Sequence, residues 1–217
     1  MKTTVKQCIV DRLRATKREN IETVIEYMNT HGFFTRHCRS HHRYDGGLAD
    51  HAWQTYLIAL RLAAENRAQN PDAPMLSEDS IAITALLHDF CNCSGMYEIT
   101  GRAHGSRSAR MLKELGLKLP IEEFLAIRFH MMSSKSRKHF LFGDAEKSLL
   151  CQLVHKADHQ SAKLYKGSNE PRGESDDFTE RIVAALGALE IKVVDDVSGE
   201  ELQRDELIDY LQNATID

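Results

Sequence analysis

An uninterrupted apolar run that ends in a His-Asp pair constrains this chain most. The run covers residues 81–87, and His88 and Asp89 follow it directly. A helix built from this run has no polar face, so it has to be buried inside the fold. Burying an imidazole next to a carboxylate costs free energy unless another group compensates both. A bound metal cation does so, because both side chains are good metal ligands.

Helical spacing of apolar residues continues along most of the chain and predicts an all-α fold. Asn20 and Ser77, which are residue types that cap helices, stand before two of the segments, and Pro120 opens a third. We expect helices at about residues 21–31, 48–62, 77–87, 106–115, 121–132 and 145–165. Their apolar stripes predict that they pack together as a bundle.

The cysteine content argues against a disulfide framework. Five scattered cysteines are an odd number, which favours a reducing, cytoplasmic setting. Cys91 and Cys93 form a CxC pair, but no second pair accompanies them, so the spacing disfavours a structural zinc cluster. The N-terminus reads as a polar segment without a signal-peptide core, and no apolar stretch reaches the length of a membrane span.

Charge and composition divide the chain near residue 166, where a polar segment with glycine and proline begins. Residues 166–217 carry 5 basic and 14 acidic side chains, a net charge of −9, whereas residues 1–165 carry 23 basic and 18 acidic side chains, a net charge of +5. We expect a helical domain over 1–165 and an acidic, mainly helical extension over 166–217. Within the extension, the pattern predicts helices near 178–189 and 200–211 and a short strand at 191–194. The basic domain suits an anionic ligand.

Four other polar residues are set into core-facing patterns in separate segments of the chain. They are His51, His104, His130 and Asp158. A single histidine of this kind is more often a hydrogen-bonded core residue than a metal ligand. Together with the His-Asp pair they make six such residues in one small domain, and this number favours a shared metal site.

The order of these residues resembles the H…HD…D signature of the HD-domain phosphohydrolases. Residues 46–51 match a GGL-x-x-H motif, residues 85–89 match the ALLHD end of a helix, and Asp158 takes the place of the final aspartate. His104 and His130 resemble the extra histidines of subgroups that hold two metals. The resemblance covers about residues 30–165 and implies an HD-domain-like helical bundle.

The resemblance also implies the chemistry of the site. The first metal would be held by His51, His88, Asp89 and Asp158, and the second by His104 and His130 with Asp89 bridging. Imidazoles and carboxylates suit one or two divalent ions of Fe, Mn, Co, Ni or Zn, with Mg as the alternative. Two such metals lower the pKa of a water between them and hold phosphate oxygens during attack. We therefore expect Asp89 to be a catalytic residue of a phosphohydrolase.

One position departs from the family pattern. Many members carry a lysine three residues after the aspartate, and this chain has Asn92 there. Asparagine forms hydrogen bonds but brings no charge. The neighbouring cations expected to replace the lysine are Arg102, Arg128 and Lys156, the last two as catalytic residues.

Basic segments lie close in sequence to the expected ligands, and arginine is well suited to binding phosphate. The substrate-binding candidates are Arg36, Arg39, Arg43, Arg102 and Arg107. For each segment taken alone, a solvated surface is an equally good interpretation.

Three functions follow from this sequence. The first is a metal-dependent phosphohydrolase that acts on a nucleotide, another small phosphate ester or a phosphodiester. The second, suggested by Asn92, is a non-catalytic protein that binds nucleotides or phosphate on the same scaffold. The third is a nuclease-like protein associated with nucleic acid, which the acidic extension and the lack of an aromatic platform disfavour. As partners we expect a small phosphorylated substrate and a homodimer, with no membrane and no stable complex with nucleic acid.

Overall fold

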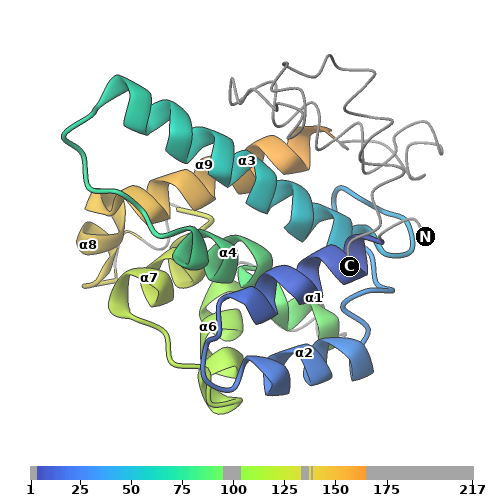
Figure 1. The fold of residues 1–217 in the computed structure, drawn as a ribbon. Coiled ribbons are helices and arrows are strands. Elements are labelled where there is room, and N and C mark those ends of the chain that lie inside the picture. The colour runs from blue at the N-terminus through green and yellow to red at the C-terminus, as the bar shows by residue number, and fades with distance from the viewer. Residues whose placement is uncertain (1–3, 95–103, 133–136, 138, 165–217) are drawn as a thin grey trace, which may run out of the picture.

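A computed structural model describes residues 4–94, 104–132, 137 and 139–164, and these residues form helices and no strand (Figure 1). The elements are α1 (Val5–Ala15), α2 (Ile21–Thr30), α3 (Gly47–Gln69), α4 (Glu78–Leu87), the 3-10 helix η1 (Phe90–Ser94), α6 (His104–Glu114), α7 (Ile121–Phe129), α8 (Phe142–Lys147) and α9 (Leu149–Leu164). The prediction of an all-α fold is confirmed.

The apolar run ending in the His-Asp pair forms α4, which contacts α1, α3, α7 and α9. All seven residues from Ile81 to Leu87 are buried, as the lack of a polar face predicts. Each fully buried Leu or Ile side chain contributes roughly 1.5–3 kcal/mol to stability. The core therefore fixes the position of α4, and with it the position of the two polar residues at its end.

Helix α3 is the longest element and lies against α9 across one side of the bundle (Figure 1). The buried residues of α3 run from Gly47 to Ala59, so its first half belongs to the core. Between the two helices, Arg61 donates a hydrogen bond to the side chain of Gln160, with an N–O distance of 2.7 Å. This packing brings His51 on α3 next to Asp158 on α9.

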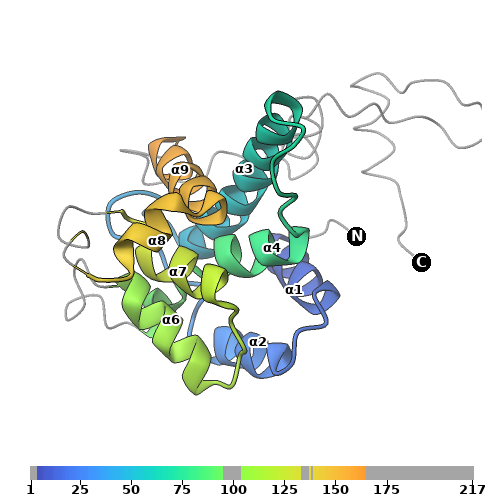
Figure 2. The ribbon, with the colours of Figure 1, turned by 90° about the vertical axis from the view of Figure 1, so that its left-hand side faces the viewer.

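Helices α6 and α7 lie side by side in Figure 2, and a glycine makes their approach close. A Cβ atom at Gly105 would lie 2.6 Å from the carbonyl oxygens of both Ile127 and Arg128. Real Cβ atoms do not come that near to backbone, so any larger residue at this position would push the helices apart. The close approach brings the start of α6 to the end of α7.

Four predicted helix boundaries are corrected by the structure. Helix α3 continues to Gln69 rather than ending near residue 62. The segment expected as one helix over 145–165 is divided into α8 and α9, because Ser148 adopts an extended conformation between them. Helix α7 ends at Phe129 rather than near residue 132, and α6 already begins at His104.

The N-terminal segment, which looks polar in the sequence, also contributes to the core. It forms α1, which buries Ile9, Val10 and Leu13 against the core. Asn20 stands before α2 as expected but does not cap it through its side chain, because its backbone is left-handed, with φ of 64°. Its amide instead donates to the carbonyl oxygen of Gly116, at 2.9 Å. A helix-capping residue type has thus been used for a tertiary contact.

The extension beyond residue 165, with its predicted helices and strand, lies outside the described residues. Its role as a separate accessory segment stays a prediction. Within the described part of the chain, every helix is too short or too polar to cross a membrane.

Candidate metal centre

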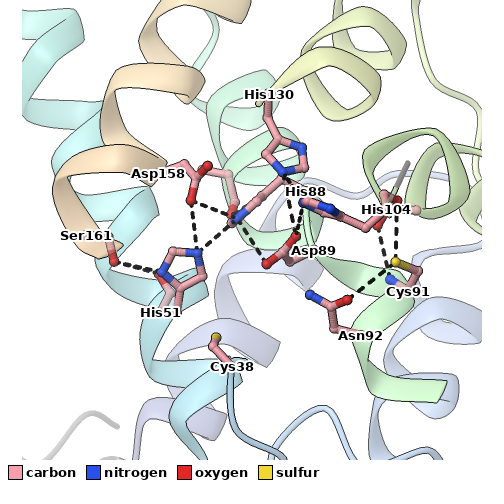
Figure 3. Close-up of polar contacts among 12 residues, drawn as sticks. Cys38, His51, His88, Asp89, Cys91, Asn92, His104, His130, Asp158 and Ser161 are labelled. Carbon is pink, nitrogen blue, oxygen red and sulfur yellow. Dashed lines mark hydrogen bonds and ion pairs between the residues drawn. The ribbon is translucent and has the colours of Figure 1, made fainter. Parts of the chain in front are cut away.

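The six polar residues singled out by the sequence meet at one place in the fold (Figure 3). His51 comes from the buried half of α3, His88 and His130 follow the last residues of α4 and α7, and Asp158 comes from α9. Asp89 and His104 complete the group. All six side chains except that of His104, which is partly exposed, are buried.

One half of this centre consists of His51, His88 and Asp158. The Nε2 atom of His51 lies 3.1 Å from Nε2 of His88 and 3.2 Å from Oδ1 of Asp158. The third side, from His88 Nε2 to Asp158 Oδ1, measures 3.7 Å. A point equidistant from three atoms at these separations lies about 2 Å from each, close to the usual bond length of a transition metal to imidazole or carboxylate.

The other half consists of His104, His130 and Asp89. The Nε2 atoms of the two histidines are 2.8 Å apart, and Oδ1 of Asp89 lies 3.2 Å from that of His104 and 3.6 Å from that of His130. These separations again leave room for an ion about 2 Å from each atom.

Asp89 stands between the two halves. Its Oδ1 atom faces His104 and His130, while its Oδ2 atom lies 3.8 Å from Nε2 of His88. One oxygen is therefore turned toward each half, which is the arrangement a bridging carboxylate needs. This geometry agrees with the bridging role that the family resemblance implies for Asp89.

Backbone carbonyl oxygens determine which ring nitrogen of His88 and of His130 is left to bind a metal. Nδ1 of His88 lies 2.8 Å from the carbonyl oxygen of Ala85, and Nδ1 of His130 lies 2.9 Å from that of Ile127. A carbonyl oxygen only accepts, so each Nδ1 carries a proton and donates it. In a neutral ring Nε2 then presents a lone pair to the centre, as a metal ligand must.

These lone pairs face other acceptors, which favours a cation among them. Nε2 of His88 faces carboxylate oxygens of both Asp89 and Asp158, which also only accept. Nε2 of His51 is the other neighbour and can donate at most one hydrogen bond to this group of acceptors. In the described part of the chain, the buried Oδ1 atom of Asp89 accepts no hydrogen bond. The donor set and this unsatisfied oxygen fit one or two divalent transition metals.

The protonation states suit metal binding at neutral pH. Burial raises the pKa of Asp89, but attraction by the surrounding imidazoles outweighs it and lowers the pKa to about 2. Burial and the interaction with His51 oppose each other in the same way at Asp158, and the net effect holds its pKa well below the ordinary range. Burial lowers the pKa of His130 to about 4, so its ring is neutral at pH 7.

Comparison with protein families agrees with this geometry, since the HD domain matches residues 48–163, more than half of the chain. The chain belongs to the HD domain family. Proteins of this superfamily are generally metal-dependent hydrolases. No curated protein and no solved structure matches the chain.

Two side chains of the HD domain hold the centre in place from outside. The hydroxyl of Ser161 on α9 lies 2.9 Å from Nδ1 of His51, and Nδ1 of His155 donates to the carbonyl oxygen of His130 at 2.6 Å. Such outer contacts orient the ligating rings. The sequence pattern gives no sign of the contact between Ser161 and His51.

The cysteines of the HD domain do not take part in the centre. Among the described residues, the groups able to hold a metal consist of histidine and aspartate. Burial raises the pKa of Cys91 to about 11 and that of Cys93 to about 12, so both thiols stay protonated at neutral pH. The thiol of Cys91 donates to the carbonyl oxygen of His104, and that of Cys93 to the carbonyl oxygen of Phe90.

Asn92 of the HD domain is buried just below Asp89 in Figure 3. Its Oδ1 atom accepts a hydrogen bond from the thiol of Cys91, with an S–O distance of 3.6 Å. An uncharged side chain therefore occupies the position of the family lysine and is held by its neighbour in the chain.

The two basic residues expected to be catalytic lie away from the centre. Arg128 covers the rings of Phe124 and Phe129, and its Nη2 atom lies 3.0 Å from Nε2 of His139. Lys156 is exposed on α9. Each precedes a centre residue by two positions, a rotation of about 200° around a helix, so it points to the opposite side.

The expected substrate-binding residues take different places. The charges of Arg107 and Arg36 offset a small part of the burial that raises the pKa of Cys91 and Cys93, so both arginines lie within electrostatic range of η1. Arg39 and Arg43 are exposed on the loop before α3. Arg102 falls outside the described residues.

Proposed function

We propose that this HD domain is a phosphohydrolase that uses a metal-activated water on a nucleotide, another small phosphate ester or a phosphodiester. The observation that carries the proposal is the buried carboxylate of Asp89, whose Oδ1 faces His104 and His130 while its Oδ2 faces His88. A centre in which one carboxylate serves two ligand sets is suited to hydrolysis of phosphate esters with two metals.

The ligand set divides into two positions. His51, His88 and Asp158 would hold one metal, His104 and His130 the other, and Asp89 both. When bound, metals there supply a water of lowered pKa and positive charge for phosphate oxygens. The chain contributes the neutral ring of His130, ionised carboxylates and a buried setting, in which the attraction between opposite charges is stronger than in water.

Two arginines support an anionic substrate. Arg36 and Arg107 lie within electrostatic range of the cysteines of η1, which follows Asp89 directly, so we expect their charge to act on this side of the centre. Guanidinium groups bind phosphate oxygens through paired hydrogen bonds. The two residues take over, in this proposal, the role that the sequence assigned to Arg128 and Lys156.

The test is phosphate release by the purified, metal-loaded chain from a panel of nucleotides, phosphate monoesters and phosphodiesters. We expect turnover of at least one class and its loss both with EDTA and in Asp89→Asn. Asp144→Asn is the matched control, since Asp144 is exposed on α8. Turnover by the metal-free protein, or by Asp89→Asn at the wild-type rate, would refute the proposal.

Asn92 supports a second candidate, a protein that binds nucleotides or phosphate without hydrolysing them. A lysine at this position would bring positive charge to the phosphate or the attacking water, and the buried asparagine brings none. Calorimetry with the same panel separates the two functions. Binding of a nucleotide to the metal-loaded protein, with no product after long incubation, would favour this second function.

A further inference from the structure

The loop before α3 folds two consecutive histidines back onto the metal centre. His42 is fully buried and has a left-handed backbone, with φ of 46°. Its carbonyl oxygen accepts a hydrogen bond from the backbone N–H of Cys38 and packs against Gly47, where an added Cβ would come within 2.1 Å of it. Left-handed backbone is unfavourable for a side chain such as histidine, and it persists only where the surroundings hold it.

The two rings face one another through their nitrogens. Nδ1 of His41 lies 3.0 Å from Nδ1 of His42. The same separation of facing nitrogens recurs at the two proposed metal positions, where it is 3.1 Å between His51 and His88 and 2.8 Å between His104 and His130. Two ligand atoms that bind one metal at about 2 Å each lie about 3 Å from one another.

This pair adjoins the centre through His51. The ring centroid of His51 lies 4.5 Å from that of His41 and 5.2 Å from that of His42. Ligand atoms of the three residues lie within 4.8 Å of one another, as do those of each group that forms the centre. His41 and His42 thus add two possible ligands beside His51 that the family pattern does not contain.

We propose that His41 and His42 form a third metal position at the His51 end of the centre. A site made only of imidazoles suits Zn, Cu, Fe or Ni. With few protein ligands, an ion there keeps positions open for water or for oxygens of an anionic substrate. This inference rests on the proposed metal centre, because the pair adjoins His51, whose Nε2 faces that centre and whose Nδ1 contacts Ser161.

The test is the number of metals per chain, measured by elemental analysis after loading with Zn²⁺ or Ni²⁺ and removal of free ion. The variants are His41→Ala and His42→Asn, the latter because asparagine tolerates left-handed backbone better than other residues with a side chain. His37→Ala is the control, since His37 lies in the same loop but is exposed. Circular dichroism establishes that each variant is folded, and His41→Ala decides alone if His42→Asn is not.

We expect three metals per chain in the wild type and in His37→Ala, and two in His41→Ala and in His42→Asn. Two metals in the wild type, unchanged in both variants, would overturn the third position and leave the proposed centre intact. A third metal that survives both substitutions would also overturn it. A wild type that binds no metal would refute the proposed function as well.

Discussion

Replacing Asp89 by asparagine separates the charge of the proposed bridge from its shape. Burial raises the pKa of Asp89, but the attraction of the surrounding imidazoles outweighs burial and lowers the pKa from 3.8 to about 2. This shift corresponds to about 2 kcal/mol of stability at neutral pH, which the uncharged asparagine cannot supply. The metal-free Asp89→Asn protein should therefore unfold more easily than the metal-free wild type by about that amount.

The larger effect appears when metal is present. An ion that binds only the folded chain stabilises it by about 2.7 kcal/mol at a concentration of 100 Kd. Two ions give about twice this value, and for a chain of this size each kcal/mol raises Tm by about 2–4 °C. The wild type should therefore gain about 10–20 °C on loading. Asp89→Asn should gain less than a third of that, because each half of the centre loses its shared anionic ligand.

The assay is thermal unfolding followed by circular dichroism, once with EDTA and once with excess Mn²⁺ or Zn²⁺. The exposed Asp144→Asn exchange makes the same chemical change away from the centre and should keep the full gain. The reasoning fails if metal raises the Tm of Asp89→Asn as much as that of the wild type. It also fails if metal leaves the Tm of the wild type unchanged.

Three further perturbations test the support of the centre. Gly105→Ala should lower the free energy of unfolding in urea by about 2 kcal/mol or more, because its Cβ would lie 2.6 Å from backbone oxygens, and calorimetry should show weaker binding at one metal site. Gly143→Ala is the control and should change neither quantity, since the space around Gly143 is open. Ser161→Ala should weaken metal binding about 10–100-fold through the lost contact to His51, with little change in fold; unchanged affinity would contradict this. The metal-free protein should lose stability as pH falls from about 6.5 to 4, since the folded state keeps His130 neutral while the unfolded chain takes up the proton; denaturation curves with no slope in this range would contradict it.

The sequence predicts the main elements of this fold because burial leaves a clear periodic signal. Residues 81–87 have no polar face, and they form the buried helix that holds His88 and Asp89. The helical character of the described residues and the membership in the HD domain family are both confirmed. The roles of the individual site residues stay predictions that the geometry supports.

Other features depend on interactions that periodicity does not express. Asn20 has a side chain suited to capping a helix, but a tertiary contact with Gly116 uses it instead. Ser148 does cap α9, since its hydroxyl accepts a hydrogen bond from the N–H of Cys151, and its extended backbone divides a long apolar pattern into two helices. In the sequence, His41 and His42 look like part of a basic loop. In the structure, the backbone of His42 is left-handed, and the ring of His41 lies against that of His51 in the centre. Sequence spacing carries no signal for such a turn.

The expected catalytic roles of Arg128 and Lys156 stay predictions, and helix geometry does not favour them. Arg128 and Lys156 stand two residues before His130 and Asp158. Two positions on a helix correspond to a rotation of about 200°, so side chains at this spacing point in opposite directions. Closeness in sequence to a metal ligand is therefore a poor guide to closeness in space within a helix.

The most direct test of the central claim is an anomalous difference map from crystals of the Mn²⁺- or Zn²⁺-loaded protein. We expect a peak among His51, His88 and Asp158 and a second among His104 and His130, with one oxygen of Asp89 about 2 Å from each. A single peak that Asp89 does not contact, or metal bound only elsewhere on the chain, would refute a centre of two metals bridged by Asp89.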